Sequence, residues 1–307
     1  MAARTLVSAV LALSVVPTAT AATPTLRFVG PPSGLALSGR SVWVSVPADD
    51  LLLRLDARTG QPTLRIDVHR VDRRAFGGGK LALGEGAVWV AAPIHVDDDR
   101  IVGNASGWIG RVDLAHGRLG IRQVHGDPPA EIAVGAAGVW VSGGRTLRRV
   151  DPISARVVAT TRLGSPMGAV AVGTEAIWVD EPGAGRLLRI DPRTRKVVAS
   201  VAIGRSTFGS SLALGRLLWA VTDRGLVAVD PSSGAVRTRV SLAGAHAVAV
   251  DGGRVWAVGR DGLYSITRGM ATRRLALPQS AADLVATADG LVWFSDSAAN
   301  SLGRFHG

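Results

Sequence analysis

The chain has 307 residues, a formal net charge of +11 at pH 7 and no cysteine. The lack of cysteine excludes a disulfide scaffold and an anchor attached through a lipidated cysteine. All but two of the 35 basic residues are arginines, and one Tyr with five Phe gives little capacity for stacking on bases, so no nucleic-acid partner is expected.

Residues 1–21 have the pattern of a secretory signal peptide. Arg4 precedes an apolar run from Leu6 to Val16, and Ala19-Thr20-Ala21 forms a small-residue cleavage site. The run is too short to span a bilayer, so no membrane span is predicted. We expect a secreted or extracytoplasmic protein of the cell envelope whose mature part, 22–307, is one domain.

A tryptophan that follows an aliphatic residue recurs along the whole mature chain. The mean interval is about 42 residues, which is typical of a four-stranded β-propeller blade. We expect each tryptophan to close the second strand of its blade. The seven positions are Trp43, Trp89, Trp140, Trp178, Trp219, Trp256 and Trp293.

The copy from Ala169 to Ile203 shows the unit most clearly. It contains four short apolar runs separated by turns, and the last turn begins with Asp191-Pro192. Short runs bounded by Gly, Pro and Asp indicate strands, and Asp-Pro favours the start of a type I turn. The sequence therefore predicts an all-β, seven-bladed propeller.

The third strand of most copies carries an arginine two positions before an acidic turn residue, as in Arg149-Val150-Asp151. This pattern decays to Ala228-Val229-Asp230 and Ser265-Ile266-Thr267 in two later copies. The final copy stops after its third strand, whereas Thr25 to Val29 precedes the first copy as an unassigned strand. We predict that this N-terminal strand completes the last blade and removes its open edge.

The repeats resemble the YVTN and streptogramin (virginiamycin B) lyase group of seven-bladed propellers. Asp289-Gly290-Leu291-Val292-Trp293-Phe294-Ser295-Asp296, followed by Asn300-Ser301-Leu302-Gly303-Arg304, carries the resemblance best. It covers nearly the whole mature chain, and its motifs specify blades rather than chemistry. The group includes enzymes, cell-surface proteins and proteins without known activity, so the resemblance implies the fold more than a function.

The resemblance also implies a residue-level test for carbon–oxygen lyase activity. His246 matches the catalytic histidine of the lyases in the link before an inner strand, and Glu181 and Asp296 match their acids in type. Gly259 stands where the family places an acid in the blade of His246, and Asp283, one blade on, is a possible substitute. A histidine base needs an orienting partner and a second acid, and the remaining pore positions are mostly small or apolar.

Two irregular spacings add residues to the face on which propeller sites usually lie. His69 to Gly79, with Arg73 and Arg74, enlarges the link into blade two, and Pro93 to Gly107 enlarges its second loop. We expect the two insertions to be neighbours in space and candidates for ligand binding. A solvated charged insertion is the simpler alternative.

The second insertion contains the remaining candidates. Asp97 and Asp99 offer carboxylates to Ca²⁺ or Mg²⁺, although the run lacks the ligand spacing of a known loop. Trp108 lies outside the repeated set and is a candidate for ligand stacking, with blade packing as the alternative.

These observations favour a monomeric module that binds a small molecule, a cell-envelope polymer or a protein through the pore-mouth face. No cofactor other than the possible cation is predicted. The alternative is a streptogramin-lyase-like enzyme with a histidine and an acid at the pore mouth.

Overall fold

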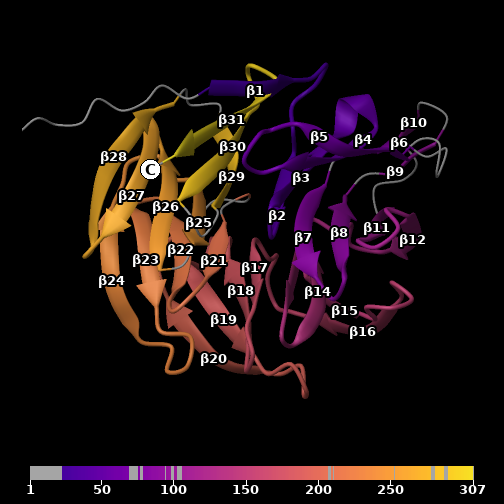
Figure 1. Ribbon diagram of the computed structural model, residues 1–307. Coiled ribbons are helices and arrows are strands. Elements are labelled where there is room, and N and C mark those ends of the chain that lie inside the picture. Colours follow the sequence, from indigo (N-terminus) through magenta and orange to yellow (C-terminus); the bar gives the residue numbers. More distant parts are fainter. Residues whose placement is uncertain are drawn as a thin grey trace, which may run out of the picture.

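The computed structural model describes residues 23–68, 75–76, 79–93, 95–97, 100–101, 106–206, 209, 211–251, 253–277, 281–286 and 290–306. In this part of the chain the strands form seven four-stranded antiparallel blades arranged in sequence around a ring (Figure 1). The predicted all-β, seven-bladed propeller is confirmed. The predicted signal peptide, 1–21, lies outside the described residues.

Each blade begins with an innermost strand beside the pore, followed by a second strand that pairs with it. The innermost strands are β2 (Gly34–Ser38), β7 (Lys80–Gly84), β13 (Glu131–Gly135), β17 (Val170–Val172), β21 (Leu212–Leu214), β25 (Ala247–Asp251) and β29 (Ala281–Ala286). The second strands are β3 (Ser41–Val46), β8 (Ala87–Ala92), β14 (Gly138–Gly143), β18 (Ile177–Glu181), β22 (Leu218–Thr222), β26 (Arg254–Gly259) and β30 (Leu291–Asp296).

The third and fourth strands complete each blade toward the rim. The third strands are β4 (Leu51–Asp56), β11 (Ser106–Asp113), β15 (Thr146–Val150), β19 (Arg186–Ile190), β23 (Gly225–Val229), β27 (Gly262–Thr267) and β31 (Ser301–His306). The fourth strands are β5 (Pro62–Asp67), β12 (Leu119–His125), β16 (Val157–Arg162), β20 (Val197–Ala202), β24 (Val236–Ser241), β28 (Met270–Ala276) and β1 (Thr23–Arg27).

An aspartate organises the turn between the third and fourth strands. In blade four, Asp191 Oδ1 accepts hydrogen bonds of 2.7 Å from the backbone N–H groups of Arg193 and Thr194. The chain then returns through Arg195 at a φ of 59°, a left-handed conformation in which glycine is unstrained. The same position is glycine in three of the equivalent turns, Gly60, Gly117 and Gly234.

The repeated tryptophans are buried between blades, with exposed fractions from 0% to 7%. Six of them lie opposite an alanine of the innermost strand, such as Ala82 opposite Trp89, and Trp293 lies opposite Val285. Inner strands approach one another closely near the axis, which favours small residues there. One detail of the prediction was wrong: the tryptophan does not close the second strand, and β3 continues from Trp43 to Val46. The strand continues because both of its faces are buried against neighbouring blades.

The N-terminal strand closes the ring. β1 pairs antiparallel with β31, Thr23 opposite Arg304 and Arg27 opposite Ser301, so the indigo and yellow ends lie side by side in Figure 1. Trp293 and Leu302 of blade seven pack in one cluster with Leu35 of blade one. The predicted closure by the N-terminal strand is confirmed.

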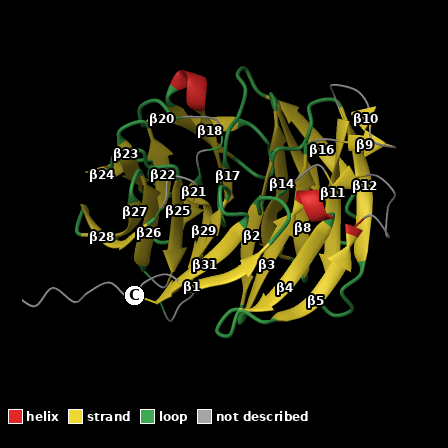
Figure 2. Cartoon of the chain, turned by 90° about the horizontal axis from the view of Figure 1, so that it is seen from above, coloured by secondary structure: helices red, strands yellow, loops and turns green. Residues whose placement is uncertain are grey.

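The two insertions of blade two meet in a separate small sheet. β6 (Ala75–Phe76) from the first insertion pairs with β9 (His95–Asp97) from the second, and β9 pairs with β10 (Arg100–Ile101). This confirms that the insertions are neighbours. Figure 2 shows β9 and β10 at the outer edge of an assembly made almost wholly of strands and loops, with short helical turns such as η1 (Pro47–Asp49) and η2 (Pro182–Ala184).

Candidate functional site at the pore mouth

One position in each innermost strand, two residues before the residue opposite the tryptophan, forms a ring at the mouth of the pore. Side chains two residues apart lie on the same side of a strand, so the register defines this position in six blades. In blade seven the register shifts between Ala281 and Leu284, and Asp283 is assigned because it accepts the same inter-blade hydrogen bond as Ser211. It lies at the end of the inner strand where the link from the preceding blade enters. Its occupants are Gly34, Lys80, Glu131, Ala169, Ser211, Ala247 and Asp283.

The charged members of this ring come from blades two, three and seven. Lys80 Nζ lies 3.6 Å from Asp283 Oδ2, although blade one stands between their blades. The blade-one position is Gly34, which has no side chain to separate them. The lysine and the aspartate therefore form an ion pair across the inner strand of blade one.

Glu131 adds a second carboxyl group to this cluster. Burial raises its pKa to about 7, and the charge of Asp283 acts in the same direction, while Lys80 opposes both. The Asp283 carboxylate in turn raises the pKa of Lys80, against the effect of burial. Near neutral pH the cluster therefore holds one stable ion pair and one carboxyl group that is close to its titration point.

Asp283 also links two blades. Its Oδ2 accepts a 3.1 Å hydrogen bond from the backbone N–H of Leu35, and the equivalent Ser211 Oγ accepts a 2.7 Å bond from the N–H of Val248. Part of the role of Asp283 is therefore structural. Lys80 and Glu131 occupy the same position in blades two and three, and no hydrogen bond from a backbone N–H of the next blade is described for either side chain.

Blade four places two more acids near the mouth, at the end of β18. Asp180 Oδ2 accepts a 2.7 Å hydrogen bond from Ser206 Oγ, and burial raises the pKa of Asp180 to about 6. Glu181 Oε2 pairs with Arg186 Nε at 2.5 Å. Both acids are 1% exposed, and Asp180 Oδ1 and Glu181 Oε1 have no hydrogen-bond partner among the described residues.

The four residues predicted for lyase chemistry are distributed over three blades. Glu181 is held by Arg186 in blade four, and the Nδ1 atom of His246 lies 2.9 Å from the carbonyl oxygen of Gly244 in blade six. Asp296 Oδ1 accepts backbone N–H groups from Ala298 and Ala299 in its own turn. Blade five separates Glu181 from His246.

Gly259 has little room for the acid that the lyases have there. A Cβ atom at this glycine would lie 2.9 Å from Leu242 Cδ1 and 3.1 Å from a ring carbon of Tyr264. An acidic side chain would therefore require both neighbours to move.

The remaining predicted ligand-binding and metal residues divide into two groups. Trp108 is 1% exposed and packs in the core cluster that contains Trp43 and Val90, so its indole lies inside the molecule rather than on a binding surface. Arg73, Arg74 and Asp99 lie outside the described residues. Asp97 is placed by its backbone at the end of β9, opposite Arg100.

Sequence analysis missed Lys80 and Glu131. Counting a fixed ten residues back from the tryptophan selects Gly79 and Ala130, one residue before each of them. The same count selects Asp283, because Val285 lies eight positions before its partner Trp293, whereas Ala82 and Ala133 lie seven positions before theirs. The available signal was a charged residue at the first position of a strand that faces the pore.

The part of the chain that the structure describes contains neither a metal-binding cluster nor a membrane-spanning helix. No cluster of three or more His, Cys, Asp or Glu side chains has an arrangement that could hold a metal ion. No helix in this part of the chain has the length and apolar character needed to cross a membrane.

Comparison with known proteins supports the fold alone. The β-propeller domain of Myceliophteria thermophila Cps50 (Swd1) aligns with a TM-score of 0.70 at 15% identity, covering 93% of this chain and 99% of that domain. The Neurospora crassa Pan2 WD40 domain aligns with a TM-score of 0.69 at 11% identity, covering 90% and 89%. No family model matches the chain, and no curated protein matches it.

Proposed function

We propose that this protein is an exported binding module that holds an amine-bearing group at its pore mouth, through Glu131 and Asp283. One observation carries the proposal: charged side chains from blades two, three and seven converge at the pore mouth, while the other ring positions carry small side chains. A pKa shifted by burial together with nearby charged partners is typical of binding sites.

The charge balance of the mouth favours a cationic group. Asp283 is already paired with Lys80, and the second carboxyl group, Glu131, acquires charge as pH rises through about 7. Asp180 of β18 adds a further carboxyl group near the mouth, whereas Glu181 is already paired with Arg186, on a chain whose net charge is +11. An ammonium group carries three donors that such oxygens accept.

A binding role also fits the propeller fold and the absence of an acidic residue at position 259 in the blade of His246. Seven-bladed propellers are compatible with interaction modules, and the partner class expected here is a small molecule, an envelope polymer or a protein that presents an amino group. The lyase alternative requires an acid beside His246, and Gly259 stands at that position with Leu242 packed against it.

The test uses ligand-observed NMR with the peptide acetyl-Gly-Lys-Gly-amide and with its Nε-acetylated form. We expect only the free amine to show saturation transfer from the protein, and the signal should strengthen from pH 6 to pH 8 as Glu131 ionises. Glu131→Gln should reduce it, whereas Glu175→Gln, at an exposed turn on the opposite face, should not. Equal signals from both peptides, or an unchanged signal in Glu131→Gln, would refute the proposal.

A further inference from the structure

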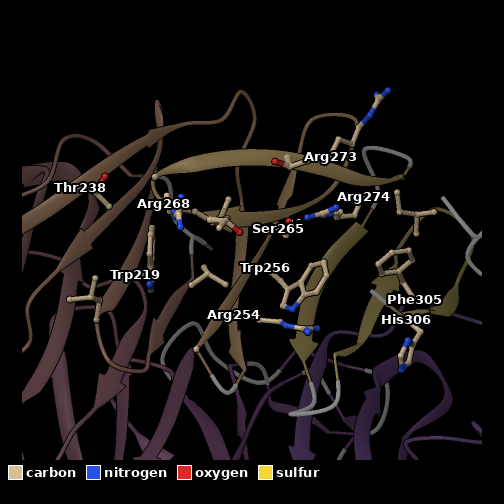
Figure 3. A pocket seen from close by; sticks show the side chains of 18 of the residues that line it. Trp219, Thr238, Arg254, Trp256, Ser265, Arg268, Arg273, Arg274, Phe305 and His306 are labelled. Atoms are coloured by element: carbon tan, nitrogen blue, oxygen red, sulfur yellow. Dashed lines mark hydrogen bonds between the residues drawn. The ribbon is translucent and has the colours of Figure 1, made fainter. Parts of the chain in front are cut away.

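A large cavity lies beside blade six on the face opposite the pore mouth. Its volume is about 1500 Å³, and it is bordered by the turn before β26 and the turn between β27 and β28. These turns emerge at the opposite ends of the strands from the ring that contains Lys80. Figure 3 shows Trp219, Trp256 and several arginines around this space.

The cavity occurs where two consecutive blades, five and six, lack an arginine that the other five blades have. In five blades an arginine of the third strand lies directly opposite the tryptophan and on the same face of the sheet. Those pairs are Trp43–Arg54, Trp89–Arg111, Trp140–Arg149, Trp178–Arg189 and Trp293–Arg304. Trp219 and Trp256, which both line the cavity, have Ala228 and Ser265 opposite them instead.

In blades two and seven this arginine reaches the turn of the next blade, and in blade two it also lies over the indole. The Arg111 guanidinium lies 5.9 Å from the ring centroid of Trp89, and its Nε donates a 2.8 Å hydrogen bond to the carbonyl oxygen of Pro152 in the turn of blade three. Arg304 makes the equivalent bond to the carbonyl oxygen of Arg58 in blade one. Ala228 and Ser265 leave that volume open.

Blades five and six, which lack the arginine, are followed by the two blades that lack the aspartate turn to which such an arginine would bond. Blade six replaces the aspartate turn by a two-residue hairpin, Arg268-Gly269, with φ values of 51° and 79°. Blade seven has no turn there, because its fourth strand is β1. The loss of the arginine and the opening of the cavity therefore have a common structural origin.

The cavity is strongly basic. Arg254, Arg268, Arg273, Arg274 and His306 line it, and no aspartate or glutamate is among the described lining residues. Two of these charges are partly balanced from outside: Arg273 pairs with Asp261 at 2.8 Å and points away from the cavity in Figure 3, and Asp251 lies opposite Arg254.

Arg274 keeps donors available for a ligand. Its Nε donates a 2.7 Å hydrogen bond to Ser265 Oγ, which fixes the guanidinium at the wall and uses one of five N–H donors. A guanidinium held in this way binds carboxylate, sulfonate or phosphate oxygens in a forked geometry.

An aromatic wall lies beside these cations. Trp256 and Phe305 meet edge to face with ring centroids 6.1 Å apart. Trp256 is 2% exposed, and no described residue accepts a hydrogen bond from its Nε1–H. The indole N–H groups of Trp43 and Trp178 are also unpartnered among the described residues, but these two tryptophans do not line the cavity. Of the three N–H groups, only that of Trp256 is therefore in a position to bind a ligand oxygen in the cavity.

We propose that the cleft between blades six and seven, bounded by Arg254, Arg274 and Trp256, is a binding site for a small aromatic anion. The anionic group lies between the two guanidinium groups and accepts from the indole N–H, and the planar body packs against Trp256 and Phe305. This site is separate from the pore mouth and does not depend on the function proposed for it.

The probe is 8-anilinonaphthalene-1-sulfonate, titrated at fixed ionic strength and followed by its fluorescence. The uncharged N-phenyl-1-naphthylamine reports the contribution of the aromatic body alone. Ser265→Arg restores the arginine that five blades carry and should fill the cleft. Arg274→Gln and Arg254→Gln remove the cations, and Arg193→Gln removes an equal charge at the exposed turn of blade four.

We expect saturable binding of the sulfonate, with its affinity lowered at least about tenfold by Arg274→Gln or Arg254→Gln, since a hydrogen bond to a charged group is lost. Ser265→Arg should abolish it, and Arg193→Gln should leave it unchanged. The proposal is overturned if Arg274→Gln binds as the wild type does, if Arg193→Gln weakens binding equally, or if the uncharged probe binds as tightly. Because Arg274→Gln is an independent variant, a Ser265→Arg protein that fails to fold does not remove the test.

Discussion

The indole nitrogen of Trp293 donates a hydrogen bond of 3.0 Å to the carbonyl oxygen of Ala57. The bond joins blade seven to the turn of blade one. It therefore acts at the same junction as the pairing of β1 with β31, but through a side chain.

Replacing Trp293 by Phe should destabilise the fold by more than the same change at Trp256. Both substitutions remove part of a buried indole, but only the first also leaves the Ala57 carbonyl without its donor, because the Nε1–H of Trp256 has no partner in this structure. We expect a difference of about 1–2 kcal/mol in the free energy of unfolding. Urea denaturation of the two variants in ligand-free buffer measures it, and equal losses would contradict the role of the hydrogen bond.

Glu131→Gln should change the pH dependence of stability. The folded-state pKa of Glu131 is raised from 4.5 to about 7, so the folded protein holds this proton more tightly than the unfolded chain does. The stabilisation is complete below pH 4.5 and is lost as pH rises to 7. At pH 8 the glutamine variant should exceed the wild type by about 1–2 kcal/mol, allowing for partial solvent exposure.

The matching measurement is a series of melting curves from pH 4 to pH 8. The two proteins should be nearly equal in stability at pH 4 and should diverge with rising pH. Parallel curves would show that Glu131 is solvated and has an ordinary pKa.

Gly34→Ala should disturb the junction between blades one and two. A Cβ atom at Gly34 would lie 2.5 Å from the carbonyl oxygen of Gly79 and 3.1 Å from the backbone nitrogen of Leu81. Because the obstacle is backbone, we expect a loss of about 1–3 kcal/mol. Gly164→Ala is the control, since a Cβ there would meet nothing within 4 Å. Similar melting temperatures for the two variants would argue against close approach at the junction.

Removing β1 should open the ring. A chain that starts at Gly30 leaves β31 as an exposed edge strand with unpaired backbone groups, whereas a chain that starts at Thr23 keeps the pairing. We expect the shorter chain to lose its single cooperative melt and to aggregate, as followed by circular dichroism and light scattering. Identical melts would mean that β1 does not contribute to closure.

The proposed export predicts a processed N-terminus. Mass spectrometry of the protein made in its native host should find a chain that begins near Ala22, because Ala19-Thr20-Ala21 is the expected cleavage site. Recovery of a chain with Met1 intact from outside the cytoplasm would contradict it.

The blades could be predicted from sequence because one side chain marks each of them. A tryptophan buried between neighbouring blades recurs at nearly constant spacing, and the turn aspartates such as Asp191 mark where the outer hairpins reverse. The residue at which each second strand ends was harder to predict, because both faces of this strand are buried and its apolar residues do not alternate with polar ones. The strand therefore continued past Trp43, where the sequence suggested that it ended.

The site residues depend on register across blades, which spacing alone does not give. The hairpin that joins β29 to β30 is one residue longer than the equivalent hairpins of blades two and three, so counting from the tryptophan found Asp283 but missed Lys80 and Glu131. The burial of Trp108 depends on how blades one and two pack, and it could not be read from its isolated place in the sequence. The only sign in the sequence of the cavity beside blade six is that Ser265 stands where other copies have an arginine. This substitution could be interpreted only once the structure showed that the residue lies opposite Trp256.

The pairing of β1 with β31 also determines when the protein can finish folding. Residues 23–27 can pair only after residues 301–304 have been synthesised, so blade seven cannot form before the last part of this sequence is available. Contacts between residues far apart in sequence form slowly, because the chain loses the entropy of closing a long loop before the paired strands contribute any stabilisation. Blades one to six can assemble in order as hairpins from the N-terminal side, and during that time β1 is an unpaired strand that needs protection from other chains.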